Sequence, residues 1–426
     1  MKKLKFAIIG AGTAGIATAI MLAQQDIDVT IFEKAPKLEP VGAGLLLQPS
    51  GLAVFKHLGI LDDAIQLGAK VTGLQGCLPN QHLLIDTHYK QAHSDFYGIG
   101  IHRATLCHLL AQKAQQYSDL ISWRIGTDIT DYHEYTHEVR ISGNDEHGYF
   151  DANFDAILIA NGARSHLRPK AWVKLDRPYP WGAKWIILPE CRVVNSAILH
   201  QFHDQSKIML GILPTGATPD APTERLSSVF WSLPKANLEQ FLRRKEDYLS
   251  WISFIEQRWP EVAAWLDTAL SNSNQTWLTA QYRDVVMHKY GQGRIGVIGD
   301  AAHAMSPQLG QGANMALLDA WALGQAVQDA RLRQQIDWSL LWRQYHQHRQ
   351  SSTQFYQFLS RLLTPLYQSD HCWTGGLRNL IFAWMYQFPY FRKEMAITVS
   401  GLKSGMFSQM HYHEIARSTL AMKKNL

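Results

Sequence analysis

The sequence has 426 residues, of which 46% are hydrophobic and 18% are charged, which excludes a disordered chain and allows a large core. The net charge of +5 comes from scattered Lys and Arg residues, so we expect no nucleic-acid partner. Four cysteines lie far apart in the chain, and we expect neither a disulfide framework nor a metal site, and a reducing, cytoplasmic location. These are Cys77, Cys107, Cys191 and Cys372.

The N-terminus predicts a dinucleotide site. A basic start followed by the apolar run of residues 6–23 could be a secretory signal, but three glycines inside that run explain it better. Gly10, Gly12 and Gly15 follow a predicted strand at 5–9 and precede helical residues up to Ala23. This order of strand, G-x-G-x-x-G and helix is typical of a Rossmann-like nucleotide site.

Each part of this motif has a physical role. Gly10 permits the tight turn, Gly12 lets the backbone approach a pyrophosphate, and Gly15 lets the helix pack on the strand. The helix N-terminus offers unpaired N–H groups to the phosphates. A second predicted strand at 28–32 ends at Glu33, which we expect to accept hydrogen bonds from ribose hydroxyls. The motif alone leaves NAD, NADP and FAD open as ligands.

A second segment favours FAD. A predicted strand at 294–298 leads into Gly299-Asp300-Ala301-Ala302-His303, then into the loop 306–314 and a helix predicted to begin near Met315. This segment resembles the G-D motif of FAD-dependent aromatic monooxygenases of the para-hydroxybenzoate hydroxylase type. The resemblance implies that Asp300 bonds the ribityl chain and that the loop from Pro307 follows the flavin ring. It also implies that the helix after Gly312 points its positive end at the flavin.

Two further segments resemble parts of the same family. His102-Arg103-Ala104-Thr105-Leu106 resembles a motif whose Arg reaches the FAD, and the loop 41–49, with Gly44, resembles one that passes the flavin. His303 matches a residue of the structural frame. The resemblance implies cofactor contacts for Gly10, Gly12, Ala14, Gly15, Glu33, Lys34, Gly44, Arg103, Ile129, Asn161, Asp300, Pro307, Gly310, Gly312, Ala313 and Asn314.

The sequence departs from the family at Asn161-Gly162, where most members have Asp-Gly. The tetracycline-inactivating flavin monooxygenases resemble this chain in having Asn-Gly there. Asn keeps an acceptor and adds donors but lacks the charge. We expect direct use of NADPH or NADH, with Arg164 and Arg168 as candidates to attract its phosphates.

The order of the motifs predicts an α/β fold in which an FAD-binding domain is interleaved with a smaller β-sheet substrate domain, followed by C-terminal helices. We assign residues 1–72, 98–176 and 280–335 to the FAD domain, 73–97 and 177–279 to the substrate domain, and 336–426 to the helical region. Strands are predicted at 180–188, 209–213 and 228–233.

The C-terminal region is rich in apolar residues at helical spacing, which predicts packing on the domain. Phe355, Phe358, Leu359, Leu362 and Leu363 show this spacing. A dimer face or an interfacial bilayer contact near residues 380–385 remains open, as does the choice between monomer and homodimer. No segment has the length and apolar character of a transmembrane helix.

The resemblance implies a monooxygenase that uses FAD, NADPH or NADH, and O2. Its chemistry would deliver oxygen from a flavin C4a-hydroperoxide to a small aromatic, phenolic or heteroaromatic substrate. Tyr and His residues of the substrate domain are candidates by type only, and no catalytic residue is assigned. Alternatives on the same fold are a flavin-dependent dehydrogenase or reductase, a halogenase and a non-enzymatic redox sensor. The Trp181 to Trp185 spacing differs from the halogenase G-W-x-W-x-I-P segment.

Overall fold

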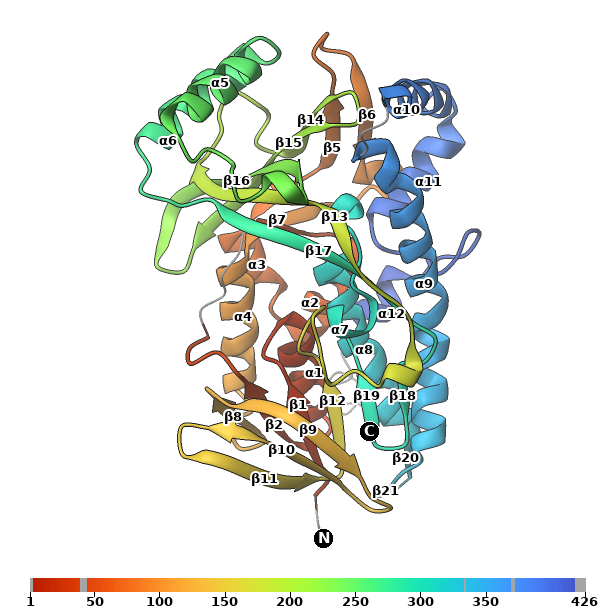
Figure 1. Cartoon of the computed structure of the whole chain (residues 1–426). Coiled ribbons are helices and arrows are strands. Elements are labelled where there is room, and N and C mark those ends of the chain that lie inside the picture. Colours follow the sequence, from red (N-terminus) through yellow and green to blue (C-terminus); the bar gives the residue numbers. More distant parts are fainter. Residues whose placement is uncertain (1–2, 39–43, 333–334, 369–371, 418–426) are drawn as a thin grey trace.

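The computed structural model describes residues 3–38, 44–332, 335–368 and 372–417. At its base lies a six-stranded sheet in the order β18-β19-β12-β1-β2-β8 (Figure 1), in which all neighbours except β18 and β19 run parallel. The strands are β1 (Lys5–Ile9), β2 (Asp28–Glu33), β8 (Ile121–Ile125), β12 (Ala156–Ile159), β18 (Gly291–Gln292) and β19 (Ile295–Val297). This mostly parallel sheet confirms the predicted α/β class.

The sheet is buried because its strands and first helix are apolar on nearly every side. Four of the five β1 residues are buried, as expected of a parallel strand covered on both faces. Helix α1 (Thr13–Ala23) is buried from Ala14 to Ala23 and packs against α8 (Gly312–Ala330). The other helices of this layer are α2 (Pro49–Leu58), α3 (Leu61–Leu67), α4 (Arg103–Gln115) and the short α7 (Asp300–His303).

A seven-stranded sheet, which we call the roof sheet, covers the other end of the molecule (Figure 1), in the order β17-β13-β16-β15-β14-β5-β6. Its strands are β5 (Gly73–Cys77), β6 (Leu83–His88), β13 (Val173–Pro189), β14 (Ile198–Asp204), β15 (Ile208–Thr218), β16 (Ala221–Pro234) and β17 (Leu278–Met287). Helices α5 (Lys245–Glu256) and α6 (Pro260–Ser271) contribute Trp251, Ile255 and Leu266 to the core on one face of this sheet.

The other strands of the described residues form three smaller sheets. β3 (Gly44–Leu47), β7 (Gly98–His102) and β4 (Ala69–Val71) form one sheet, and β9 (Asp128–Glu134), β10 (Val139–Asp145) and β11 (Gly148–Phe154) form an antiparallel meander. β20 (Arg331–Leu332) and β21 (Gln335–Ile336) pair with each other. Short 3-10 turns occupy Tyr89–Gln91, Lys170–Trp172, Lys235–Asn237 and Pro307–Leu309.

Of the C-terminal helices, the first runs along the side of the molecule past both large sheets, and the next two lie beside the roof sheet (Figure 1). The C-terminal helices are α9 (Trp338–Tyr367), α10 (Cys372–Met385), α11 (Pro389–Val399) and α12 (Tyr412–Ala416). Asp337 starts α9 because its side chain accepts a hydrogen bond from Leu340 N at 3.0 Å. Within the described residues, no helix combines the length and the apolar character that crossing a bilayer requires.

The packing predicted for α9 is wrong at two positions. Phe358 and Leu362 are more than half exposed, while Phe355, Leu359 and Leu363 are only partly buried. The side of α9 that faces the protein carries many polar side chains, several of which donate hydrogen bonds to α8, β17 and the loop at Ser306. Its buried polar residues are Arg349, Ser352, Thr353, Gln357, Ser360 and Thr364.

The other element predictions hold with shifted ends. β1 matches the predicted strand, whereas α8 begins at Gly312, three residues before the predicted start at Met315. The predicted strands at 180–188, 209–213 and 228–233 lie inside the longer β13, β15 and β16. The division into domains stays a prediction, and we propose that it follows the two large sheets, although β13 and β17 cross the proposed boundaries.

Candidate functional site

The glycine turn after β1 has two tightly packed glycines and one open one. Gly10 has φ +111°, and a Cβ there would lie 2.5 Å from the Ala160 carbonyl oxygen. A Cβ at Gly15 would collide with the Gly10 carbonyl oxygen. By contrast, nothing lies within 4 Å of a Cβ at Gly12, which precedes α1, and no side chain caps that helix. Among the described residues the backbone at Gly12 is therefore open, and its contact with a ligand phosphate stays a prediction.

The carboxylate of Glu33 is held in place at the end of β2. Ala11 N donates to its Oε2 and Ala35 N donates to its Oε1, each at 2.9 Å. Each oxygen keeps a lone pair for a further donor. The predicted contact Lys34 is exposed, and Ile129 is buried at the start of β9. The segment before Ile129 is beside Glu33, since Thr127 N donates to the Glu33 carbonyl oxygen at 2.9 Å.

The G-D segment lies against this glycine turn. Gly299 has φ +62°, and a Cβ there would be 2.7 Å from the Ala14 Cβ, so the two turns touch. Asp300 follows as the first residue of α7 and is exposed. A Cβ at Gly312 would lie 3.9 Å from Asp300 Oδ1, which puts this carboxylate at the N-terminus of α8. Within the described residues, no group donates a hydrogen bond to the Asp300 carboxylate or forms an ion pair with it. Both of its oxygens are therefore available to a ligand.

The loop from Pro307 to Asn314 has open residues and one buried tie. Pro307, Gly310 and Gly312 are exposed, and Ala313 is half-buried. Asn314 is fully buried, and its Oδ1 accepts from Gln48 N at 2.9 Å. Its Nδ2 donates to the carbonyl oxygens of Leu46 and Gly310, both at 3.1 Å. Asn314 therefore holds the loop to β3, and its amide hydrogens are already used.

Gly44 and Arg103 lie at the ends of the paired strands β3 and β7. Gly44 is buried, its N–H donates to Ser228 Oγ at 3.1 Å, and a Cβ there would collide with Thr215. Packing under the roof sheet thus explains Gly44. Arg103 opens α4 and is exposed, after His102, whose Nδ1 caps the helix. Val41 to Ala43 of the predicted flavin loop lie outside the described residues.

Asn161 brings an unpartnered acceptor to the glycine turn. It follows β12, and its Cα is 2.9 Å from the position of a Cβ on Gly10. Among the residues that the structure describes, its buried Oδ1 has no hydrogen-bond partner, and no atom lies within 4 Å of a Cβ at Gly162. A buried acceptor without a donor costs about 1–3 kcal/mol, so it is well suited to a bound ligand. We call Gly12, Glu33, Asp300 and Asn161 the open rim.

The prediction that Arg168 attracts nucleotide phosphates is wrong. Arg168 is buried, and its Nε donates to the Ala301 carbonyl oxygen at 2.5 Å. Its two terminal nitrogens bond Asp176 and the Ala163 carbonyl oxygen, both at 2.8 Å. This guanidinium ties the Asn161 segment to α7 and has no free face. Arg164 is exposed and donates to Gln281 Oε1 at 3.3 Å.

A buried charge cluster supports the open rim from behind. Asp319 of α8 accepts from His303 Nε2 at 2.5 Å, from Gly299 N at 2.7 Å and from Arg349 Nε at 2.7 Å. Although desolvation alone would raise the pKa of Asp319, the charges of His303 and Arg349 lower it well below its usual value. The buried charge cluster, His303, Asp319 and Arg349, therefore fixes the turn that carries Asp300. Sequence reasoning missed Asp319 and Arg349, which lie inside helices with no motif around them.

A buried carboxyl group faces the junction between the roof sheet and the loop before Pro307. Asp284 on β17 is 3% exposed, no described residue forms a hydrogen bond with its Oδ2, and Arg177 Nε is 3.7 Å away. The next residue, Val285, donates its N–H to the Ala304 carbonyl oxygen at 2.9 Å. Burial raises the pKa of Asp284 above its usual value. Sequence reasoning also missed this residue, because an acid in a strand reads as a solvent-facing position.

An aromatic pair includes Tyr282, two residues before Asp284 on β17. Trp185 Nε1 donates to Tyr282 Oη at 3.3 Å, and burial raises the pKa of Tyr282 to about 12. Tyr282 is therefore a neutral phenol at neutral pH.

Cys77, Cys107 and Cys191 are free thiols.

Comparison with known proteins connects this geometry to a family. Residues 3–356 match the model of the FAD binding domain. The chain is 26% identical to a 3-amino-4-hydroxybenzoate 2-monooxygenase from Streptomyces cremeus over 76% of this chain and 78% of that protein. Its fold matches a p-nitrophenol 4-monooxygenase from Pseudomonas putida DLL-E4 with a TM-score of 0.76, at 14% identity, over 95% of this chain and 100% of that one. The tetracycline destructase Tet(51) matches with a TM-score of 0.61, at 17% identity, over 96% and 100% of the two chains.

Proposed function

The chain belongs to the FAD binding domain family and is a flavin monooxygenase, and from this premise we propose that it hydroxylates a small phenolic or heteroaromatic compound with electrons from NADPH or NADH. The reaction would consume the substrate, O2, NAD(P)H and one proton, and yield the hydroxylated product, water and NAD(P)+. Relatives named for phenolic substrates support this substrate class.

The single observation that carries the proposal is the open rim. Its groups come from four distant parts of the chain and keep unused hydrogen-bonding capacity, while Asp319 behind them takes three hydrogen bonds. These groups fit FAD: Gly12 would admit the pyrophosphate, Glu33 the ribose hydroxyls and Asp300 the ribityl chain. When bound, FAD would accept a hydride from NAD(P)H and activate O2 for transfer to the substrate.

We propose that the chain's own groups then hold the substrate and exclude water. Asp284, with a raised pKa and a free oxygen, would bond a substrate hydroxyl and take up its proton at Oδ2. The apolar side chains around Trp185 and Phe230 on the roof sheet would keep water from the ring that is hydroxylated.

Flavin release and oxygen labelling test this function. The purified protein should be yellow and should release about one FAD per chain on denaturation. A phenolic compound that stimulates NAD(P)H oxidation should gain one labelled oxygen from isotopic O2, as mass spectrometry would show. Release of FMN, or a product that gains oxygen from water or only loses hydrogen, would contradict the proposal.

Asn161 allows a test of the electron donor. A carboxylate there would lie near nucleotide phosphates, and two like charges about 4 Å apart repel by about 4 kcal/mol at an effective dielectric of about 20. Asn161 offers an acceptor without that repulsion, so we infer direct reduction by NADPH or NADH. Anaerobic mixing should bleach the flavin absorbance, even if slowly. No bleaching with either nucleotide, in the presence of substrate, and recovery in Asn161→Asp would contradict this inference.

A further inference from the structure

The last helices carry an exposed aromatic cluster. Trp384 contacts the rings of Phe388 and Phe391 at centroid distances of 5.2 and 5.7 Å, and Tyr390 contacts Phe391 at 5.6 Å. Three of these four rings remain exposed to solvent: Trp384 by 54%, Phe388 by 43% and Tyr390 by 61%. Leu380, one turn before Trp384 on α10, is 70% exposed. We call Leu380, Trp384, Phe388, Tyr390 and Phe391 the aromatic face.

This face is held rigidly by the opposite side of α10. Phe382 is buried in a cluster with Met209 and Phe230 of the roof sheet. Tyr386 Oη lies 2.5 Å from Thr87 Oγ1 of β6, within hydrogen-bond distance. Because one side of α10 is fixed to the sheet, the helix cannot turn its apolar side inward to bury it. The aromatic face therefore stays exposed in the folded chain. An exposed apolar patch of this kind is typical of a site that contacts another molecule.

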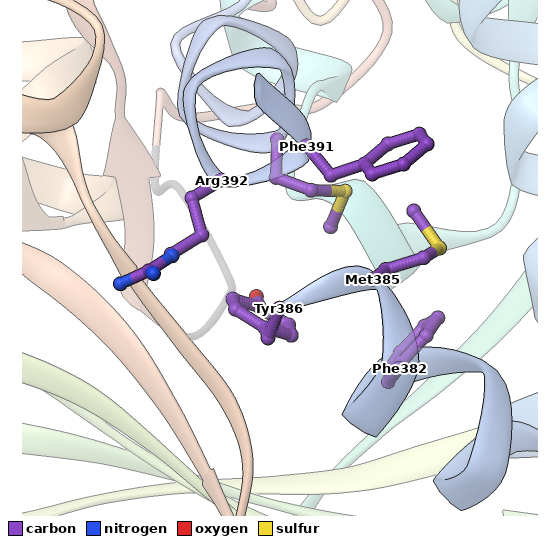
Figure 2. Close-up of a pocket in the computed structure, with 6 residues that line it drawn as sticks. Phe382, Met385, Tyr386, Phe391 and Arg392 are labelled. Carbon is purple, nitrogen blue, oxygen red and sulfur yellow. The ribbon is translucent and has the colours of Figure 1, made fainter. Parts of the chain in front are cut away.

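A crevice opens between α10 and α11 beside the aromatic face (Figure 2). It is shallow and is lined by Phe382, Met385, Tyr386, Phe391, Arg392 and Met395. Five of its six lining residues are apolar or aromatic, and the sixth, Arg392, is a cation. Figure 2 shows the Arg392 side chain directed away from Met385, so the polar group lies to one side of an apolar space.

Two exposed cations of α11 lie next to the aromatic face. Arg392 and Lys393 are exposed, and the acid that follows them, Glu394, is paired with the buried Lys403. From Phe355 to Lys393 the sequence has four basic residues and one acid, Asp370, which lies outside the described residues. All residues of α11 are described, and its one acid, Glu394, is already paired with Lys403. The exposed cations therefore have no free acid beside them on this helix.

Aromatic rings next to exposed cations that form no ion pair within the described residues match the chemistry of an anionic bilayer surface. Trp and Tyr prefer the membrane interface, and Lys and Arg can bury their stems while the charge stays with lipid phosphates. A symmetric dimer built on this face would instead bring Arg392 and Lys393 of both copies together, which repels. We propose that the aromatic face docks this enzyme peripherally on an anionic lipid bilayer, with α10 and α11 lying in the interface.

Vesicle binding by the full-length, FAD-loaded protein tests the proposal. It should co-sediment with phosphatidylcholine vesicles that contain phosphatidylglycerol, much less with phosphatidylcholine alone, and less as salt increases. The charge variant Arg392→Gln/Lys393→Gln should bind about 10- to 30-fold more weakly, since each cation near an anionic surface contributes about 1 kcal/mol. The matched control Arg243→Gln/Lys245→Gln changes two exposed basic residues near the start of α5 and should bind like the parent protein.

The aromatic variant separates the bilayer from other occupants. Trp384→Ser/Phe388→Ser should lower vesicle binding about 10-fold or more and should retain its bound FAD, which reports folding. Tyr149→Ser is the control, because Tyr149 is exposed on β11 at the far end of the molecule. No binding to anionic vesicles would overturn the proposal. A concentration-dependent dimer that the aromatic variant abolishes and vesicles do not compete with would also overturn it in favour of self-association.

Discussion

Asp300 and Asp319 lie in consecutive helices of the same layer, and their surroundings are opposite. Asp319 is fully buried and its two oxygens take three hydrogen bonds, whereas Asp300 is exposed and its oxygens take none from the described residues. The G-D segment and its neighbourhood therefore contain two kinds of residue. Those of the buried charge cluster hold the chain in shape, and those of the open rim leave capacity for a ligand.

The largest expected effect comes from breaking the buried charge cluster. Asp319→Asn would leave the Arg349 guanidinium buried without a counter-charge, and we expect a loss of about 3–5 kcal/mol in the free energy of unfolding. Urea denaturation of the FAD-free protein measures it. Asp300→Asn is the matched control and should change stability by no more than about 0.5 kcal/mol. Equal stabilities of the two variants would show that the two carboxylates do not differ as described.

Asp300→Ala should have the opposite effects to Asp319→Asn, with weaker FAD binding and unchanged stability. We expect FAD affinity to fall about 10- to 100-fold, because a hydrogen bond to a charged group contributes about 1.5–3 kcal/mol, while the stability of the FAD-free protein stays unchanged. Titration of the FAD-free protein, followed by flavin fluorescence, gives the dissociation constant. Unchanged affinity would mean that Asp300 does not contact the cofactor.

Glu33 combines both roles, so its substitution should produce two smaller effects. Glu33→Ala removes the acceptor for Ala11 N and Ala35 N, and we expect a loss of about 1 kcal/mol in stability and about 10-fold in FAD affinity. Glu33→Gln keeps one oxygen and should lie between Glu33→Ala and the parent in both measurements. An effect on stability alone would make Glu33 a structural tie like Asn314.

Sequence patterns predicted the residues of the open rim better than the buried residues that support the open rim. The glycine turn, Glu33 and the G-D segment were visible because each is local: a few residues at a fixed spacing carry the geometry. Asp319 and Arg349 could not be seen, because their pairing joins α8 to α9 and depends on how two helices pack. Arg168 was misjudged for the same reason, since only the tertiary structure shows that Ala301 of α7, Asp176 and Ala163 take its donors. Helical spacing also failed to reveal that α9 buries polar side chains and leaves Phe358 and Leu362 exposed.

Asp284 offers the smallest effect and the sharpest test, because it is buried like Asp319 and has a free oxygen like Asp300. Burial raises its pKa in the folded protein above the value of about 3.9 in the unfolded chain. Between these two values the folded state binds more protons, so the contribution of Asp284 to stability falls as pH rises through that window. Above it the buried charge costs stability, offset in part by Arg177 at 3.7 Å.

Asp284→Asn removes this charge. We expect the variant to be up to about 1 kcal/mol more stable than the parent at pH 7, with the difference shrinking as pH falls toward 4. Urea denaturation at several pH values measures it, and Asp300→Asn, with an exposed side chain, should show no such trend. If Asp284 also receives the substrate proton, the more stable variant should turn over more slowly. A stability difference that does not change with pH would show that the Asp284 carboxylate is not held at a raised pKa by burial.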